Sequence, residues 1–312
     1  MIDFDKGIEK FSKFRGSEKK VAVLYENELY MIKYPDRIRE KKIQMSYKNN
    51  HFSEHIGCQI FRSCGFETQE TTLGYFTNDM GNKKIVVGCK DFTQDGSTLL
   101  EFGSLANAIE DFDNQRSTTI ENVNIVIEKH KLIKNKDEVK GRFWDMFVID
   151  ALLANKDRHL GNWGLLEKGD EIKFSPIYDC GSTLSALLTD EEMETGLSDP
   201  IEFKNKEFNA SSCYKVGGKR IFYHEIFQNP PKELEEAIKR TVPKINMEKI
   251  HSIIDSVDEI SNVRKEYLKK SLDVRYKQII EPALNRVLQQ EKEIGAENLN
   301  IRRHKGEGFP RS

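Results

Sequence analysis

The chain has 312 residues, a length that suggests two domains or two lobes with a cleft between them. Its 49 Lys and Arg against 51 Asp and Glu leave a net charge of −2, so the total charge does not support binding to nucleic acid or to an anionic membrane. Charged residues make up 32% and hydrophobic residues 38%, which is typical of a soluble protein with a heavily charged surface. The five cysteines are scattered without a C-x-x-C pair, and we expect reduced, mostly buried thiols.

No apolar segment approaches the roughly 18 residues that a membrane span needs, and the N-terminus lacks the apolar core of a signal peptide. We therefore expect a cytoplasmic protein, with export without a signal peptide left open.

The first hundred residues predict a sheet and one helix. Segment 21–34 is rich in β-branched and aromatic residues around a central polar turn, which predicts a hairpin whose second strand ends at Lys33. Apolar residues recur at helical spacing over 51–65, and Gly65 supplies the stop signal. The apolar run 85–89 predicts a buried strand.

Beyond Thr98 the pattern becomes mainly helical. A charged stretch covers 105–140, and a largely buried helix is predicted over 142–154. A strand is predicted over 171–179, ending in Asp179. Segment 185–230 is polar and loop-rich.

The C-terminal region is predicted to be helical from 232 to 292. The remaining residues, 293–312, are typical of a flexible, solvated tail.

The strongest chemical signal is D-R-H-x-x-N at 157–162, followed by D-C-G at 179–181. Phosphoryl transfer needs an Asp that accepts the proton of the attacking hydroxyl, and an Asn and a second Asp that hold Mg²⁺ against the nucleotide phosphates. The bland alternative is a polar loop that follows a buried helix.

The runs FWDMFVIDALLANKDRHLGNWG and SPIYDCGSTL resemble the catalytic half of the HipA-like kinases, in particular their short, cell-translocating CtkA-type members. The resemblance implies a bacterial kinase with an α+β, two-lobed fold and ATP in the cleft. Residues 1–97 would form a small β-rich lobe with one key helix, and residues 98–292 a larger, mostly helical catalytic lobe.

Carried over residue by residue, the resemblance makes Asp157 the catalytic base and Asn162 and Asp179 the Mg²⁺ ligands. Lys33 would bind the α- and β-phosphates, and Glu54 would pair with Lys33. An ordinary lysine at the end of a strand is the alternative for Lys33.

The resemblance also implies nucleotide contacts that have weaker sequence signals. The backbone of Lys90, Asp91 and Phe92 would form the hinge that binds adenine. Gly16 and Ser17 would belong to the phosphate loop, although this loop has one glycine where protein kinases have G-x-G-x-x-G. Family analogy implies autophosphorylation at Ser17, and the alternative sites considered are Thr183 and Ser185.

Arg158 and His159 are assigned with the nucleotide-binding residues, since Arg158 is able to neutralise a phosphate. For His159 we favour a structural hydrogen bond that fixes the loop, because the family's base is the Asp. Asp145 is expected on a solvated face, and Asp150 is expected to anchor the loop.

The sequence contains one motif of a different enzyme class and one partial match to a nucleotide-binding motif. His51, Glu54 and His55 match H-x-x-E-H, which would place two zinc ligands and a base on one helical face of a peptidase. The segment Gly217-Gly218-Lys219 lacks the first glycine and the hydroxyl of a Walker motif.

The sequence therefore predicts an ATP- and Mg²⁺-dependent kinase that transfers the γ-phosphoryl group to Ser or Thr of a protein. The main alternative keeps the site but phosphorylates a lipid or a small molecule, and a pseudokinase binding module is a third. An antitoxin or a host protein is a conceivable partner. Longer HipA toxins have an N-terminal segment for which this chain has no room, which weighs against the usual toxin–antitoxin architecture.

Overall fold

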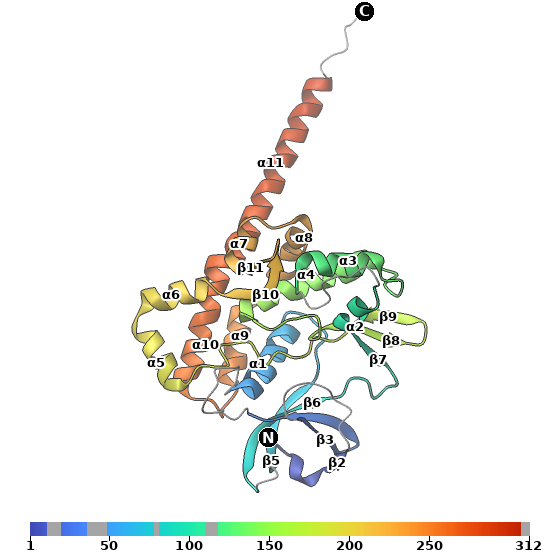
Figure 1. The fold of residues 1–312 in the computed structure, drawn as a ribbon. Helices are drawn as coiled ribbons and strands as arrows, with labels where there is room; N and C mark the ends of the chain where they lie inside the picture. The colour runs from blue at the N-terminus through green and yellow to red at the C-terminus, as the bar shows by residue number, and fades with distance from the viewer. Residues whose placement is uncertain (11–19, 36–48, 78–80, 110–117, 307–312) are drawn as a thin grey trace, which may run out of the picture.

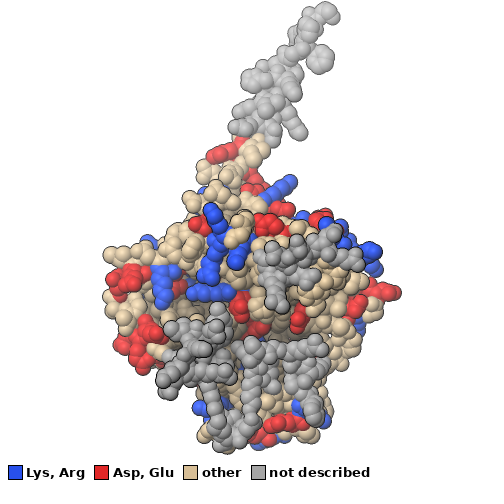
Figure 2. Space-filling model, in the orientation of Figure 1, with Lys and Arg blue, Asp and Glu red and all other residues tan. Residues whose placement is uncertain are grey.

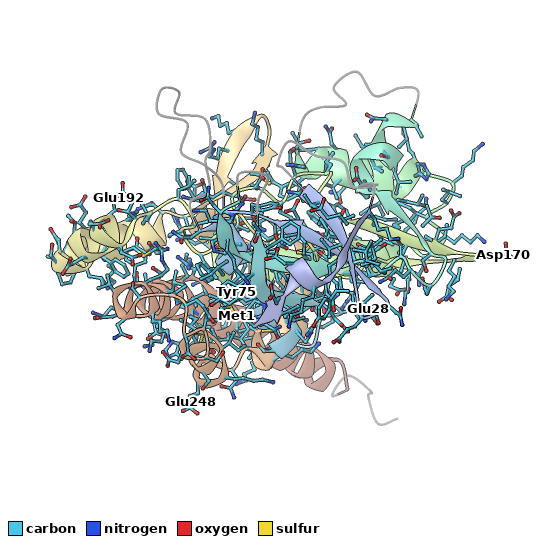
Figure 3. The ribbon with its side chains drawn as sticks, turned by 90° about the horizontal axis from the view of Figure 1, so that it is seen from below. Met1, Glu28, Tyr75, Asp170, Glu192 and Glu248 are labelled. Atoms are coloured by element: carbon cyan, nitrogen blue, oxygen red, sulfur yellow. The ribbon has the colours of Figure 1, made fainter. Side chains whose placement is uncertain are left out.

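The computed structural model describes residues 1–10, 20–35, 49–77, 81–109 and 118–306. A small β-rich lobe lies below a larger, mainly helical lobe, from which the C-terminal helix projects (Figure 1). Seen from the side of the small lobe, Glu192 and Asp170 mark opposite ends of the larger lobe (Figure 3). No helix in the described ranges is long and apolar enough to cross a bilayer.

The small lobe contains a six-stranded sheet of order β1-β5-β6-β4-β3-β2, in which only the β1–β5 pair is parallel. The strands are β1 Ile2–Asp3, β2 Ile8–Lys10, β3 Lys20–Tyr25, β4 Glu28–Lys33, β5 Thr71–Thr77 and β6 Lys83–Lys90. A short 3-10 helix, η1, covers Phe4–Lys6, and α-helix α1 covers Asn50–Ser63. The predicted sheet, helix and buried strand are confirmed.

The hairpin β3–β4 turns on Glu26 and Asn27, which have φ values of 48° and 65°. Left-handed conformations at both central residues define the type I′ turn, whose twist matches that of the flanking strands. The strand register then places Lys33 opposite Val87 of β6. The turn thus delivers Lys33 to the inner end of its strand.

Helix α1 is packed between the sheet and the larger lobe. Its Ile60 belongs to one continuous core with Val87 of β6 and with Ile250 of helix α9, Met247–Asp255. A separate small core covers the other face of the sheet and is formed by Phe4, Val23, Ile32, Phe76 and Val86. Helix α1 therefore joins the two lobes through apolar packing.

The larger lobe is built on helix α4, Lys136–Leu153, which is buried along most of its length as predicted. The other helices are α2 Phe102–Asn107, α3 Ile120–Lys129, α5 Asp190–Ser198, α6 Pro200–Phe208, α7 Tyr223–Gln228, α8 Lys232–Thr241, η2 Val242–Lys244, α10 Asn262–Arg275, η3 Tyr276–Ile280 and α11 Glu281–Gly306. A three-stranded sheet contains β7 Thr98–Glu101, β8 Gly164–Lys168 and β9 Glu171–Phe174, and a hairpin contains β10 Ser211–Val216 and β11 Lys219–Phe222.

Four sequence predictions need correction. Residues 98–101 form strand β7, and the strand expected to reach Asp179 ends at Phe174. Segment 185–230 is not loop-rich: it contains α5, α6, the β10–β11 hairpin and α7. Thr189 caps α5 in a capping box, and Asp199 caps α6, so the polar residues that indicated loops are helix caps. Helix α11 continues past residue 292 to Gly306.

Candidate active site

Lys33 lies at the centre of a buried ion-pair cluster that joins both lobes. Its Nζ is 2.6 Å from Glu54 Oε2 and 2.8 Å from Asp179 Oδ1, so the expected contact with Glu54 is present. Burial by itself lowers the pKa of a lysine, but the carboxylates of Asp179 and Glu54 outweigh it and hold the pKa of Lys33 well above its ordinary value. Lys33 is therefore a permanent cation.

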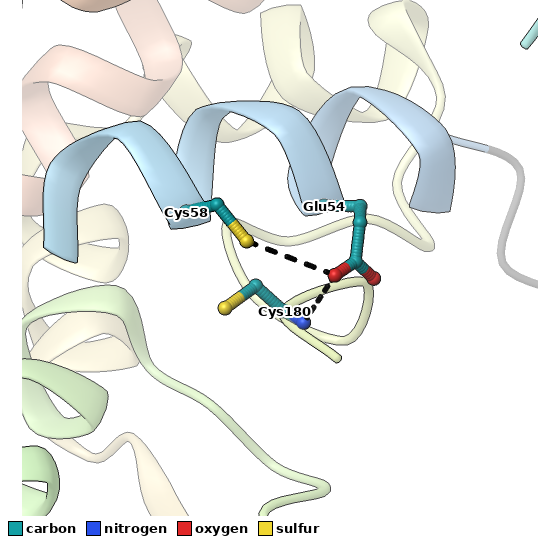
Figure 4. Close-up of side chains that lie close together, drawn as sticks. All are labelled: Glu54, Cys58 and Cys180. Carbon is teal, nitrogen blue, oxygen red and sulfur yellow. Dashed lines mark hydrogen bonds between the residues drawn. The ribbon is translucent and has the colours of Figure 1, made fainter. Parts of the chain in front are cut away.

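Glu54 also binds the D-C-G segment (Figure 4). Its Oε1 accepts the backbone N–H of Cys180 at 3.0 Å and the thiol of Cys58 at 3.8 Å. Helix α1 approaches this segment closely at Gly57, where an added Cβ would lie 2.8 Å from the Cβ of Cys180. The Glu54 carboxylate is thus held by strand, helix and loop together.

Asp179 adopts a left-handed backbone conformation with φ 57°. A non-glycine residue in this region stores strain of about 1–3 kcal/mol, which persists where the surrounding contacts over-determine it. Its side chain is 31% exposed, whereas those of Lys33 and Glu54 are 4% and 0% exposed. Of the three charged groups, Asp179 is the one open to a ligand.

Asp157 lies in the loop that follows α4. The C-cap of this helix, Ala154, has a left-handed conformation. The loop is held by two side-chain amides: Asn155 Oδ1 accepts the Asp157 N–H at 3.0 Å, and Asn162 Nδ2 donates to the Asp157 carbonyl at 2.7 Å. The carboxylate of Asp157 accepts a hydrogen bond from Ser182 Oγ at 3.4 Å. This bond fixes the orientation of the Asn162 amide, whose Oδ1 is the atom able to bind a cation.

The charge environment of Asp157 links the two halves of the predicted site. Burial raises the pKa of Asp157, the nearby His159 lowers this pKa, and the negative charge of Asp179 raises it. The structure therefore brings Asp157 within electrostatic reach of Asp179, although 22 residues separate them in sequence. Together with Asn162, they supply the oxygen atoms that a hard divalent cation prefers.

Arg158 is placed differently from the prediction that it contacts a phosphate. The residue is 1% exposed, and its Nε and Nη2 bind both oxygens of Asp150, at 3.0 and 3.2 Å. Nη1 donates to the carbonyls of Asn162 at 2.8 Å, of Tyr178, and of Asp179 at 3.4 Å. Arg158 is a positioning residue that clamps the loop at 157–162 against the D-C-G segment, and Asp150 is the predicted loop anchor.

His159 is exposed, and its Nδ1 accepts the backbone N–H of Gly161 at 3.0 Å. This is the structural hydrogen bond favoured from sequence. Asp145 is not on a solvated face: it is buried and binds Arg240 Nη2 at 2.8 Å.

In the predicted hinge, the backbone groups of Lys90 and Asp91 already form hydrogen bonds within the protein. The N–H groups of Lys90 and Asp91 donate to the carbonyls of Glu70 and Leu29, both at 2.8 Å. Their carbonyl oxygens each accept from a glutamine side chain at 3.0 Å. The N–H groups of Lys90 and Asp91 are therefore not available to adenine, and each of their carbonyl oxygens has one lone pair left. The hinge role of residues 90–92 stays a prediction. Gly16 and Ser17 lie outside the described residues.

The zinc-peptidase alternative finds no support in the described part of the chain. There, the group able to hold a metal contains Glu54, Cys58 and Cys180, and neither histidine belongs to it. Glu54 is engaged by Lys33, and His55 bonds Thr71. Burial lowers the pKa of His51 to about 4. All five cysteines are free and four are buried, as expected.

Sequence reasoning missed three residues that shape the site. Asn155 is fully buried and orients the Asp157 backbone, Ser182 contacts the Asp157 carboxylate, and Tyr178 donates its hydroxyl to the Gly161 carbonyl at 3.1 Å. Their proximity to the two motifs was the available signal, but their side-chain partners are set by tertiary packing.

Residues 12–249 match the HipA-like C-terminal domain. The serine/threonine-protein kinase CtkA of Helicobacter pylori is 39% identical over 276 residues, which cover 86% of this chain and 83% of that protein. The crystal structure of the H. pylori proinflammatory kinase CtkA superposes with a TM-score of 0.84 at 38% identity, covering 93% of this chain and 98% of that one. These comparisons confirm the two-lobed kinase fold, and we conclude that the chain belongs to the HipA-like family of protein kinases.

Proposed function

We propose that the chain uses ATP and Mg²⁺ to phosphorylate Ser or Thr hydroxyl groups of a protein. The observation that carries this proposal is the contact of Lys33 with both Glu54 and Asp179, next to the loop that presents Asp157. This arrangement brings together the three groups that phosphoryl transfer needs. Lys33 is a cation able to bind phosphates, Asp179 is a carboxylate able to bind a metal, and Asp157 is a candidate base. The name of the H. pylori relative supports a protein acceptor with Ser or Thr.

The donor set fits Mg²⁺, since Asp179 offers a partly exposed carboxylate and Asn162 offers an amide oxygen. Bound Mg-ATP would supply the transferable phosphoryl group and the metal charge that neutralises it. Lys33 would hold the α- and β-phosphates, with Glu54 fixing its ammonium group. In the hinge, the backbone of Phe92 would contact adenine.

Asp157 would accept the proton of the attacking hydroxyl. Its pKa is raised by burial, which makes its carboxylate a better proton acceptor than that of an ordinary aspartate. Arg158 would keep this loop in register with Asp179 through the carbonyl groups that it binds.

Autophosphorylation is part of the proposal, with Ser17 as the first candidate. Thr183 is a poor alternative because it is fully buried and its Oγ1 donates to the Cys180 carbonyl at 2.8 Å. Ser185 is partly exposed and stays a second candidate.

The test is transfer from labelled ATP to a bacterial extract that is then resolved into protein and lipid fractions. We expect label in protein, dependent on Mg²⁺. Asp157→Asn should abolish transfer with Mg-ATP affinity largely retained, whereas Asp179→Asn should weaken Mg-ATP binding in calorimetry. The exposed Lys232→Ala serves as the control. Label confined to lipid would overturn the protein-kinase proposal, and equal loss of affinity in both aspartate variants would overturn the assigned roles.

A further inference from the structure

A group of basic residues near the candidate base has no ion-pair partner among the residues that the structure describes. Among the described residues, none of its members forms an ion pair, and all are exposed: Lys156, Lys206, Lys215, Lys219 and Arg220. We call these five residues the basic patch. Many other cations of the molecule are paired, for example Lys168 with Asp95 at 2.6 Å. The patch therefore presents net positive charge on a chain whose total charge is −2.

The β10–β11 hairpin holds positively charged side chains opposite each other, which destabilises the strand pair. Lys215 lies directly opposite Arg220 in the antiparallel register, and Lys219 lies opposite Val216. Like charges in directly opposed positions destabilise a strand pair. Neither Lys215 nor Arg220 forms an ion pair with a described residue, although Glu121 Oε1 accepts the Gly217 N–H in the hairpin turn at 2.9 Å. A local conflict of this kind is typical of a surface kept for binding.

The hairpin is fastened to the loop that carries Asp157. Tyr214 of β10 accepts a hydrogen bond from the indole of Trp163 at 3.0 Å. Tyr223, directly after β11, donates its hydroxyl to the carbonyl of Asn155 at 2.7 Å. The position of the hairpin relative to the candidate base is thus set by two buried tyrosines.

Lys156 connects the patch to the base in sequence and in space. It directly precedes Asp157. Although its side chain is exposed overall, partial burial of its ammonium group and the positive charges of Lys206 and Arg220 lower its pKa. Glu207 also faces Lys156, but its carboxylate is bound by Arg275 and by the Tyr267 hydroxyl. Lys206 and Arg220 therefore lie within electrostatic reach of Lys156, and Lys215 is the strand partner of Arg220.

Basic side chains also gather on this part of the molecular surface. Lys and Arg side chains gather over α6 and next to the β10–β11 hairpin, and Asp and Glu side chains lie below them (Figure 2). The Nζ of Lys206 lies 5.8 Å from the ring centre of Tyr267.

We infer that the basic patch binds acidic side chains that flank the acceptor Ser or Thr of the substrate protein, and so positions the acceptor hydroxyl at Asp157. This inference rests on the proposed function and specifies its substrate class. A substrate hydroxyl at Asp157 brings its neighbouring residues next to Lys156, and carboxylates there would supply the partners that the patch lacks. Complementary charge of this kind gives specificity and faster association.

The experiment compares two acceptor peptides that differ only in their flanks, one with glutamates and one with the isosteric glutamines. We expect the parent enzyme to show a higher kcat/KM for the glutamate peptide. This preference should weaken with added salt, because exposed charges are screened. In Lys215→Glu/Arg220→Glu, the ratio of the two kcat/KM values should fall about tenfold, as for exposed charge pairs turned from attraction to repulsion.

The control is Lys84→Glu/Lys232→Glu, which makes the same change in charge at exposed lysines outside the patch and should leave the ratio unchanged. Lys215→Gln/Arg220→Gln should give an intermediate ratio, and circular dichroism checks that each variant is folded. An unchanged ratio in a folded, active patch variant would overturn the inference. An equal fall of the kcat/KM ratio in the control variant would also overturn it. The same holds if the patch variant loses binding to phosphatidylserine vesicles while its kcat/KM ratio for the two peptides stays unchanged. If the parent phosphorylates neither peptide nor any extract protein, the proposed function itself fails.

Discussion

Lys33 and Arg158 are both buried cations, yet their surroundings give them different tasks. Lys33 contacts the carboxylate of Asp179, which is partly exposed, so a ligand is able to reach this pair from the solvent. Arg158 binds Asp150 and backbone carbonyls, and a guanidinium with its donors so engaged fixes geometry. Removing either partner of the Asp150–Arg158 pair would leave a buried charge uncompensated.

Lys33→Ala and Glu54→Ala should not be additive in their effect on Mg-ATP affinity. Both changes break the contact of 2.6 Å between Nζ and Oε2, so the second has less left to remove. We expect the double variant to bind about as weakly as Lys33→Ala alone, with a coupling energy of about 0.5–3 kcal/mol in a calorimetric double-mutant cycle. A double-variant loss equal to the sum of the single losses would show that the pair does not act as a unit.

The pH dependence of transfer should report Asp157. Its pKa is raised by burial and by Asp179, so the acid limb of kcat/KM for the acceptor should lie above the ordinary aspartate value of about 3.9. Activity should fall as the pH falls through that raised pKa, since the base works as a carboxylate. His159→Gln removes the group that lowers this pKa, and should move the acid limb to higher pH at saturating Mg-ATP. A limb that stays in place or moves to lower pH would contradict the assignment.

At the scale of elements, the site depends on how closely α1 approaches the D-C-G segment. The approach is possible because Gly57 has no side chain: a Cβ there would also lie 3.2 Å from Thr183 Oγ1. This packing places Glu54 where one carboxylate binds both Lys33 and the Cys180 backbone. The helix and the segment therefore form one rigid support for the charged groups.

Gly57→Ala should lower both activity and melting temperature, because α1 has to move away from Cys180 and takes Glu54 with it. The matched control is Gly141→Ala in α4, where the nearest atom to a new Cβ is Arg240 Nη2, the end of a flexible side chain, at 3.4 Å. That variant should keep activity and gain up to about 1 kcal/mol from helix propensity. Thermal melting and turnover are measured for both variants. If Gly57→Ala stabilised the protein as much as Gly141→Ala, the tight contact between Gly57 and Cys180 would be refuted.

At the scale of the whole molecule, the lobes share a core even though their folds differ. Val87 and Cys89 of the sheet pack in the same cluster as Ile254 of α9. The small core around Phe4 belongs to the outer face of the sheet. Phe4 fits there because Gly74 and Gly88 lie under its ring, where a Cβ at Gly88 would come within 2.3 Å of Phe4 Cζ.

The two lobes should consequently unfold in one cooperative transition. Trp144 and Trp163 are the two tryptophans of the chain and both are buried in the larger lobe, so fluorescence reports that lobe. Far-UV circular dichroism reports both lobes. We expect coincident denaturant midpoints for the two signals, as in two-state unfolding. A fluorescence midpoint clearly above that of circular dichroism would mean that the sheet unfolds separately.

The sequence by itself determined the features that depend on local geometry. The β3–β4 hairpin, helix α1 with its stop at Gly65, and helix α4 were predictable, because turn residues and apolar periodicity act within a few residues. The residues at 157–162 and 179–181 also pointed to phosphoryl transfer, since that chemistry requires these residue types at close spacing.

Only the tertiary structure decided which partners these residues have. The contact of Lys33 with Asp179 spans 146 positions, and no local pattern encodes such a pair. Burial turned Arg158 from a candidate phosphate ligand into a clamp, and existing hydrogen bonds removed Lys90 and Asp91 as free hinge donors. In segment 185–230, packing and capping made helices and a hairpin from residues that indicated loops. Long-range ion pairs and burial are properties of the packed chain, because they arise only when segments far apart in sequence are brought together.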